Sequence, residues 1–428
     1  MKMTTKAASF LMRHNFPVGM DVGAAAGAIL NDMRQGLSGK KAGQDMIRTW
    51  MLPPSSRPKN ERVIVIDAGG TNFRSCLVSF DDDGCAAISD FKKDKMPGVE
   101  RELSKAEFFA QIADNIEHLR DKADKIGFCF SYSMKITEDG DGIPNGFSKE
   151  VKAPEVIGVP VGKTLLETLS ARGWKSVSRV TLLNDTVAAL LAGKAATRAG
   201  AEYSAYIGFI LGTGMNAAYV QPADSSLGIE KQIVVCESGK CGDVPLSDFD
   251  KAVDAGTNIP GQYLLEKGCS GAYLGRLGGE MLSVAVSEGL FSDGAAQAVK
   301  ALGAINTVEM NEFLHSPFGT GRIAAAFPGA CEDDRLFACE ILDAAVDRTA
   351  RYAAAILSAN AIQSGGGKSS LRPVAMLCNG TTFFKTYRLR ERTEAYLQEY
   401  LVGKCGIHFE ILCADDDITL GTAVGALS

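Results

Sequence analysis

The chain has 428 residues, too many for a single hydrophobic core, and its composition of 46% hydrophobic and 22% charged residues is ordinary for a soluble protein. The net charge of −6 gives no reason to expect nucleic acid or an anionic membrane as a partner, and no apolar run reaches the roughly 18 residues of a membrane helix. Eleven cysteines without a CxxC pair, and only four histidines, favour reduced thiols in a cytoplasmic protein over disulfides or a zinc site.

The first 60 residues predict helices followed by a linker. The segment 23–37, "GAAAGAILNDMRQGL", is typical of a helix, and "LPPSSRPKN" at 52–60 is rich in helix breakers. The first residues make a poor signal peptide, because Arg13 and His14 interrupt the apolar stretch.

Strands and helices then alternate, which predicts an α/β domain with a mixed sheet. Residues 63–80, "VIVIDAGGTNFRSCLVSF", predict a hairpin whose first strand ends at Asp67. A helix is expected over 106–123, with Phe109, Ile112, Ile116 and Leu119 on one face. The further elements expected are a strand at 125–133, a helix at 161–173 closed by Gly173, a strand at 180–185 and a helix at 186–196.

A second hairpin is predicted at 206–220, "YIGFILGTGMNAAYV". Its "LGTGMN" aligns with "DAGGTN" at 67–72, a weak internal repeat that would place two glycine turns opposite one another across a cleft. Residues from about 245 to 360 are mostly helical in pattern. The loop "SGGGKSS" at 364–370 is not a P-loop, since Ile362 stands where the upstream glycine is required.

The two glycine turns are candidate phosphate sites. A glycine N–H can approach an anion closely, and successive N–H groups bind phosphate oxygens. Asp67 is placed to hold Mg²⁺ through water, and the planar guanidinium of an arginine can donate paired hydrogen bonds to a phosphate group. The alternative for each turn alone is an ordinary tight hairpin with a solvated acid. The candidates are Asp67, Gly69, Gly70, Thr71, Asn72 and Arg74 in the first turn, and Gly212, Thr213 and Gly214 in the second.

Asn184 and Asp185 form a second kind of candidate site in "LLNDTVAALLAG" at 182–193. They lie between a predicted strand and a predicted helix, where ligands bind in α/β sheets. A carboxylate there could take the proton from an alcohol that attacks phosphorus. The alternative is that Asp185 is only a helix N-cap.

With these motifs the sequence resembles the hexokinases of the sugar-kinase/Hsp70/actin superfamily. Both glycine hairpins and the Asn-Asp segment are similar to family motifs, and the resemblance continues in colinear order from about residue 61 to 425. The remaining similar segments are "FCFSYSMK" (128–135), "GFSKEVKAP" (146–154), "VVCESG" (234–239), "LLEKGCSGAYLG" (264–275) and "MLCNGTTFFK" (376–385).

The resemblance implies a role for each matching residue. Asp185 would be the general base on the sugar 6-hydroxyl, with Lys149 and Arg74 completing the catalytic set, and Asp67 would serve Mg²⁺. Gly380 and Thr381 would lie near adenosine. The sugar hydroxyls would be held by Ser131, Ser148, Lys149, Asn184, Asp185, Asn216, Glu237 and Glu266.

Some of these residues have simpler explanations. Lys149 could be a solvated loop lysine and Glu266 a surface helix residue, whereas Glu237 follows an apolar run and needs a partner. The sequence also departs from the family pattern around the sugar: Ser238 replaces a tryptophan, Tyr263 stands where a glutamine is expected, and Ser131-Tyr132-Ser133 replaces Ser-Phe-Pro. These departures leave the preferred hexose open.

The resemblance implies an α/β, two-lobed ribonuclease-H-like (actin-like ATPase) fold with a mixed sheet in each domain and a central cleft. The expected small domain comprises 61–185 and 419–428, and the large domain 1–60 and 186–418. The expected activity is transfer of phosphate from ATP, with Mg²⁺, to a hexose, with glucose ahead of mannose or fructose, by a single-unit monomer or homodimer. Alternatives are a kinase for another acceptor, such as an N-acetylhexosamine, and a non-catalytic sugar sensor.

Overall fold

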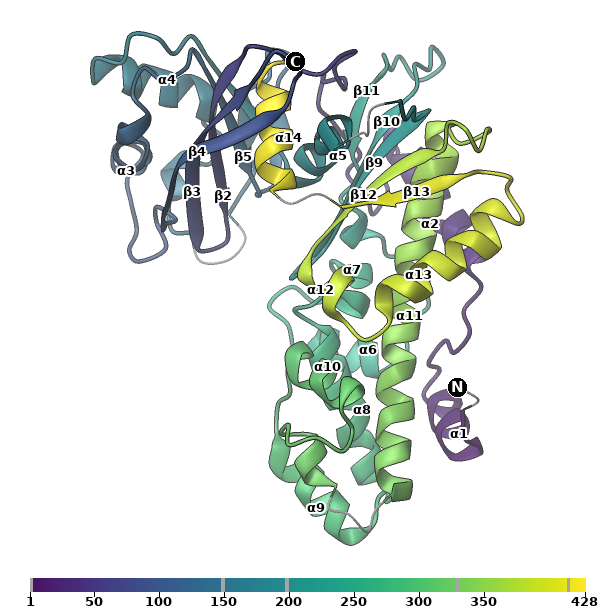
Figure 1. Cartoon of the computed structure of the whole chain (residues 1–428). Coiled ribbons are helices and arrows are strands. Elements are labelled where there is room, and N and C mark those ends of the chain that lie inside the picture. Colours follow the sequence, from purple (N-terminus) through teal and green to yellow (C-terminus); the bar gives the residue numbers. More distant parts are fainter. Residues whose placement is uncertain (1–2, 148–150, 197–199, 328–331, 414–415) are drawn as a thin grey trace.

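The computed structural model describes residues 3–147, 151–196, 200–327, 332–413 and 416–428, and its strands form two large mixed sheets in two lobes (Figure 1). The smaller lobe contains the sheet β4-β3-β2-β5-β8. Its strands are β2 Arg62–Gly69, β3 Asn72–Phe80, β4 Ala86–Lys95, β5 Lys125–Phe130 and β8 Arg179–Leu183. Beside it lie α3 Lys105–Asn115, α4 Val161–Ala171 and the hairpin β6 Met134–Ile136 and β7 Gly142–Pro144.

The larger lobe is built on the sheet β1-β11-β10-β9-β12-β13. Its strands are β1 Ile47–Arg48, β9 Ala205–Leu211, β10 Met215–Gln221, β11 Gln232–Val235, β12 Val374–Asn379 and β13 Phe409–Leu412. The order β11-β10-β9-β12-β13 has two antiparallel pairs followed by two parallel pairs, which is also the pattern of β4-β3-β2-β5-β8. The weak internal repeat of the sequence therefore corresponds to two sheets of the same topology.

The last strand of each repeat leads into a helix that crosses to the other lobe. The helix α5, Asp185–Ala196, follows β8 but packs on β9 and β12, whereas α14, Asp417–Ala426, follows β13 but packs on β5 and β2. The two helices also pack on each other between the sheets (Figure 1). Asp185 is therefore the first residue of a helix that connects the two lobes.

The rest of the larger lobe is helical and extends away from both sheets along the 33-residue helix α11 (Figure 1). The interior of α11 is largely buried, because other helices cover it on several sides. The covering helices are α1 Thr5–Arg13, α2 Val22–Leu37, α7 Leu264–Cys269, α8 Leu274–Ser287, α10 Thr307–His315 and α13 Leu389–Leu397. The helical part also contains α6 Asp248–Ala255, α9 Asp293–Leu302, α11 Glu332–Ser364 itself and α12 Thr381–Lys385.

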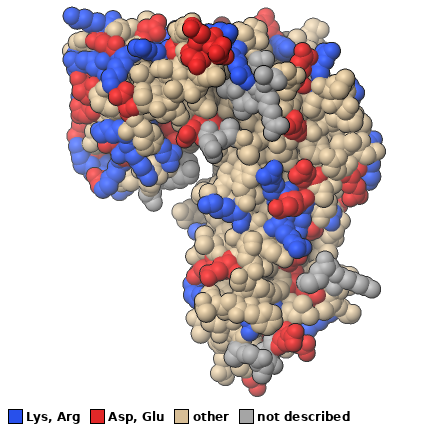
Figure 2. All heavy atoms as spheres, in the orientation of Figure 1, with Lys and Arg blue, Asp and Glu red and all other residues tan. Residues whose placement is uncertain are grey.

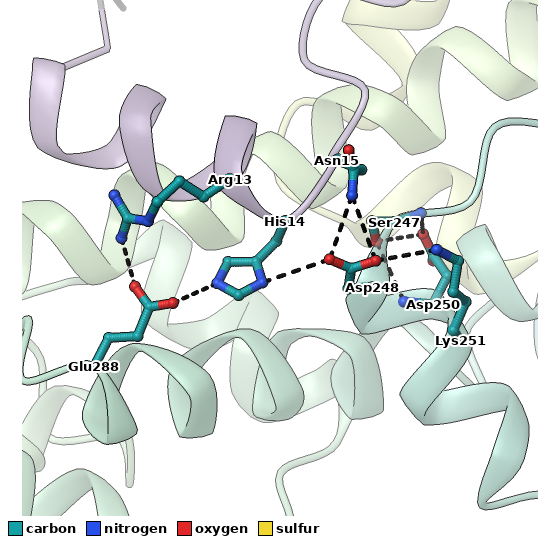
Figure 3. A network of polar contacts seen from close by, with 8 residues as sticks. All are labelled: Arg13, His14, Asn15, Ser247, Asp248, Asp250, Lys251 and Glu288. Carbon is teal, nitrogen blue, oxygen red and sulfur yellow. Dashed lines mark hydrogen bonds and ion pairs between the residues drawn. The ribbon is translucent and has the colours of Figure 1, made fainter.

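The N-terminal helix α1 is anchored on this helical part by polar and aromatic contacts. His14 follows α1; its Nε2 lies 2.6 Å from Glu288 Oε1 and its Nδ1 3.8 Å from Asp248 Oδ2 (Figure 3). Arg13 pairs with the same Glu288, and Phe10 packs against Phe249. These contacts explain why the charged end of α1 lies at the surface while its apolar face is buried.

Several bounds of the predicted elements are corrected by the structure. The strand expected at 125–133 ends at Phe130, and the strand expected at 180–185 ends at Leu183. The helix expected over 106–123 ends at Asn115, and a 3₁₀ turn, Glu117–Leu119, follows. Because residues three apart eclipse in a 3₁₀ turn, Ile116 and Leu119 remain buried together. The strand expected to end at Asp67 continues to Gly69, since Asp67 pairs with Arg74 in the hairpin ladder. Among the described residues, none of the helices has the length and apolar character of a membrane span.

Candidate active site

The first glycine turn joins β2 to β3 at the end of the smaller sheet. Gly69 pairs with Asn72, which leaves Gly70 and Thr71 as the turn, and Gly70 has a φ of 60° that suits glycine. The buried Tyr132 supports the turn, because its hydroxyl donates to the Gly70 carbonyl at 3.3 Å. One of the residues that departs from the family pattern thus contacts a predicted phosphate turn.

Asp67 and Arg74 lie on neighbouring strands beside this turn. Arg74 Nη1 is 2.7 Å from Asp67 Oδ2, so the predicted phosphate ligand and the predicted magnesium ligand form an ion pair with each other. Asp67 is less exposed than Arg74, with side-chain exposures of 15% and 45%. The pair leaves the arginine side chain on the solvent side, where it can exchange Asp67 for an anionic ligand.

The second glycine turn joins β9 to β10 and contacts two other segments. The Gly212 N–H donates to the Gly214 carbonyl at 2.9 Å, and the Gly212 carbonyl accepts from the Gly271 N–H and from Thr382 Oγ1, each at 2.8 Å. Gly380 has a φ of 114°, and a Cβ there would lie 2.2 Å from the Leu211 carbonyl oxygen. The predicted adenosine residues therefore lie directly against the predicted phosphate turn.

Gly271 and Thr382 also belong to this group, although no local sequence signal distinguishes them. A Cβ at Gly271 would lie 2.4 Å from Thr382 Oγ1 and 2.7 Å from the Gly212 carbonyl oxygen. Both residues stand inside quoted motifs, but only the folded chain brings them against the turn. Thr213 and Thr381 are exposed beside it, as Thr71 is on the first turn.

Asn184, not Asp185, is the N-cap of α5. The Asn184 carbonyl accepts from the Ala188 N–H at 3.0 Å, and its side-chain oxygen accepts from the Thr186 N–H at 2.9 Å. Asp185 is the first helical residue, and its carboxylate also accepts from the Thr186 N–H at 2.8 Å. The simple capping explanation therefore belongs to Asn184, and the carboxylate lies at the positive end of the helix dipole.

Three polar residues of the larger lobe form a connected group. The Asn216 amide donates to Glu237 Oε1 at 2.7 Å, which is the partner that the sequence required for Glu237. Glu266 Oε2 accepts from the Met215 N–H at 2.9 Å, and a Cβ on Gly214 would lie 2.8 Å from this oxygen. Glu266 is therefore held against the second glycine turn and is not a free surface residue.

The group faces the smaller lobe. Burial raises the pKa of the Glu237 carboxyl to about 7; Lys240 opposes the rise, and the negative charges of Asp45 and Asp185 add to it. Asn184 and Glu237 also line one pocket between the lobes, together with Tyr132 from the smaller lobe and Val235 from the larger. The candidate general base and the candidate sugar residues thus converge from two lobes.

Ser148 and Lys149 lie outside the described residues. Ser131 follows β5, where its N–H donates to the Ala68 carbonyl at 3.1 Å, and a Cβ at Gly69 would lie 3.0 Å from the Ser131 Cβ. Ser131 therefore connects the first glycine turn with the predicted sugar segment.

The residues present fit a magnesium–nucleotide complex. Asp67 supplies carboxylate oxygens, which a hard cation prefers, at the edge of the first turn. Gly271 and Gly380 lie so close to neighbouring backbone or hydroxyl oxygens that larger side chains do not fit. This close packing brings three backbone segments together at the second turn, with Thr213 and Thr381 exposed beside it.

The repeated sheet topology, the crossed helices and the paired glycine hairpins define a class: the two-lobed α/β proteins with the actin-like ATPase fold. Family models described as hexokinase match residues 20–195 and 206–428. The chain belongs to the hexokinase family.

Two curated relatives show the extent of the likeness. Hexokinase-2 of Equus caballus is 26% identical over 420 residues, which cover 92% of this chain and 45% of that protein. Hexokinase-5 of Oryza sativa subsp. japonica is 26% identical over 358 residues, 77% of this chain and 69% of that protein. The chain thus spans about half the length of the horse relative.

Two solved structures share the fold. A hexokinase from Schistosoma mansoni, complexed with glucose, superposes with a TM-score of 0.74 at 21% identity and covers 99% of both chains. A second hexokinase structure gives a TM-score of 0.80 at 19% identity, covering 99% of this chain and 100% of the other. The expected two-lobed fold is thereby confirmed.

Proposed function

We propose that the chain transfers the terminal phosphate of ATP to the 6-hydroxyl of a hexose, with glucose as the first candidate. The observation that carries the proposal is the arrangement of Asn216, Glu237 and Glu266 opposite Asp185, next to the two glycine turns. A sugar offers many hydroxyls and no charge, so carboxylates and amides suit it better than arginines. The family supports the same reaction, and a relative was solved with glucose.

In this mechanism Asp185 accepts the proton of the attacking hydroxyl, while Asn184, Glu237 and Glu266 hold the sugar. Phosphoryl transfer depends mainly on positioning and on stabilisation of charge on the phosphate oxygens. ATP supplies the phosphoryl group, and Mg²⁺, when bound, would offset the negative charge of the phosphates. The backbone N–H groups of the glycine turns, together with Arg74, would bind the phosphate oxygens. Closure of the lobes would exclude water and limit ATP hydrolysis.

Asp185→Asn tests the assignment of the base. The variant keeps the shape of the side chain but cannot accept the proton, so we expect kcat for glucose to fall by about 10²- to 10⁴-fold, while the glucose dissociation constant changes less than about threefold. The rate of ADP release, measured with each of a panel of hexoses, gives kcat, and calorimetric titration with glucose gives the dissociation constant. The exposed Asp333→Asn is the matched control.

Two outcomes would contradict the proposal in different ways. If the wild-type protein releases no ADP with any hexose, the chain is not a hexose kinase. If ADP is released only with an N-acetylhexosamine, that sugar is the acceptor in place of glucose. If Asp185→Asn turns over at the wild-type rate, another group is the base.

A further inference from the structure

Lys240 lies at the edge of the candidate sugar group, although the sequence analysis gave it no role. It ends the 3₁₀ turn Ser238–Lys240 that directly follows Glu237, and its N–H donates to the Glu237 carbonyl at 3.0 Å. Its ammonium lies 2.5 Å from Asp45 Oδ2 and 5.4 Å from the centroid of the Tyr263 ring. The lysine therefore joins the N-terminal segment, the sugar group and the start of α7.

Hydrogen bonds and close packing also fix the backbone around Lys240. Asp32, on α2, accepts hydrogen bonds from the N–H groups of Gly43 and Gln44 at 2.7 and 2.9 Å, which orders the loop that carries Asp45. Gly43 packs so closely that a Cβ there would lie 2.7 Å from the Lys240 carbonyl oxygen. Only 22% of the Lys240 side chain is exposed, so its charge has a defined position.

Tyr263 gives this lysine a contact that the family pattern does not include. It stands where the pattern has a glutamine, in the left-handed backbone conformation at the N-cap of α7, the helix that carries Glu266. Burial raises the pKa of the Tyr263 hydroxyl, Lys240 opposes the rise, and Glu237 and Glu266 add to it. The lysine and both glutamates therefore act on the tyrosine.

The groups that act on Glu237 come from several elements. Asn216, on β10, donates to its carboxylate; Asp185, on α5, and Asp45, in the loop before β1, disfavour its ionised form. After burial, the largest influence is the positive charge of Lys240, which favours the ionised form. Asp45 in turn keeps Lys240 charged, because its carboxylate raises the pKa of the ammonium against burial.

We propose that Lys240, held by Asp45 and Tyr263, is a positioning residue that keeps the Glu237 carboxylate ionised and thereby sets the affinity for the hexose. The inference rests on the proposed function. An ionised carboxylate accepts hydrogen bonds from two sugar hydroxyls, whereas the protonated acid must donate one of its own. Loss of the ionised form therefore weakens sugar binding without changing the base Asp185.

The test is the pH dependence of glucose binding in the full chain, measured by calorimetry from pH 5.5 to 9 with ATP turnover in parallel. For the wild type, affinity falls as the pH drops through about 7, where Glu237 takes up a proton. Lys240→Met moves this transition upward by about one pH unit, which lowers the ionised fraction at pH 7 from about a half to about a tenth. The glucose dissociation constant at pH 7 then rises about fivefold, and the difference disappears near pH 9.

Two variants separate charge from shape. Lys240→Arg keeps the charge and should restore the wild-type pH profile, and the exposed Lys231→Met is the matched control that should leave the profile unchanged. A structural role alone would weaken binding equally at every pH. An unchanged profile in Lys240→Met, or a loss of affinity that does not diminish near pH 9, would overturn the inference while wild-type turnover still supports the proposed function. If the wild type shows no turnover with any hexose, the proposed function itself is wrong.

Discussion

At the scale of single residues, the two candidate phosphate turns differ in the space around their glycines. Gly271 and Gly380 approach the 211–212 backbone so closely that no side chain fits at either position. By contrast, a Cβ on Gly70 has no described atom within 4 Å, so that glycine is required by its φ of 60° alone. The second turn is therefore fixed by packing, and the first by conformation.

Gly271→Ala should weaken nucleotide binding selectively. The added methyl would meet Thr382 Oγ1 and the Gly212 carbonyl oxygen, and an overpacked contact costs about 1–3 kcal/mol. We expect KM for ATP to rise about tenfold and KM for glucose to change less than about twofold, measured by ADP release. Equal increases in both constants would show that the turn does not serve the nucleotide.

At the scale of elements, α5 and α14 form the connection between the lobes, and glycines allow their close approach. A Cβ on Gly421 would lie 1.8 Å from the Ala188 carbonyl oxygen, and a Cβ on Gly208 in β9 would lie 2.1 Å from the Thr186 carbonyl oxygen. The helix α5 is thus in backbone contact with both lobes. Its first residue, Asp185, takes its position from this packing.

Gly421→Ala should destabilise the fold, because the facing atoms belong to the backbone and cannot rotate away. We expect the free energy of unfolding in urea to fall by about 1–3 kcal/mol or more. Gly294→Ala in α9 is the control, since no described atom lies within 4 Å of its Cβ, and it should be neutral or slightly stabilising. Equal stability of the two variants would mean that α5 and α14 are not in close contact.

At the scale of the whole molecule, the proposed sugar residues are divided between two lobes. Ser131 and Asn184 follow strands of the smaller lobe, Asp185 begins the helix that connects the lobes, and Asn216, Glu237 and Glu266 lie in the larger lobe. In the space-filling view the surface is hollowed where the lobes meet (Figure 2). A ligand that contacts both groups gains most when the lobes approach.

Glucose should therefore make the molecule more compact. We expect the radius of gyration measured by small-angle X-ray scattering to decrease with D-glucose and to stay constant with L-glucose, which has the same composition but the wrong hydroxyl geometry. Asp185→Asn should still close, since it retains the sugar contacts. A radius that is the same with and without D-glucose would show that binding needs no closure.

The sequence by itself predicted the two glycine hairpins, the strands β5 and β8, several helices and the ordered motifs, because hydrophobic periodicity and glycine turns are local signals. It also offered Asp67, Asp185 and Glu237 as candidates, since an acid at a strand end or after an apolar run is conspicuous, whereas Glu266 became a candidate only through the family resemblance. Local signals do not determine where a helix gives way to a tighter turn, as at Asn115.

Only the tertiary structure decided how these residues combine. Asp45, Lys240 and Tyr263 come from three separate segments and carry no joint pattern, yet their charges and rings meet beside Glu237. Gly271 and Thr382 likewise acquire meaning only against Gly212. The physical reason is that pKa values and close contacts depend on distances through space, which the topology of the two sheets and the crossing of α5 and α14 establish.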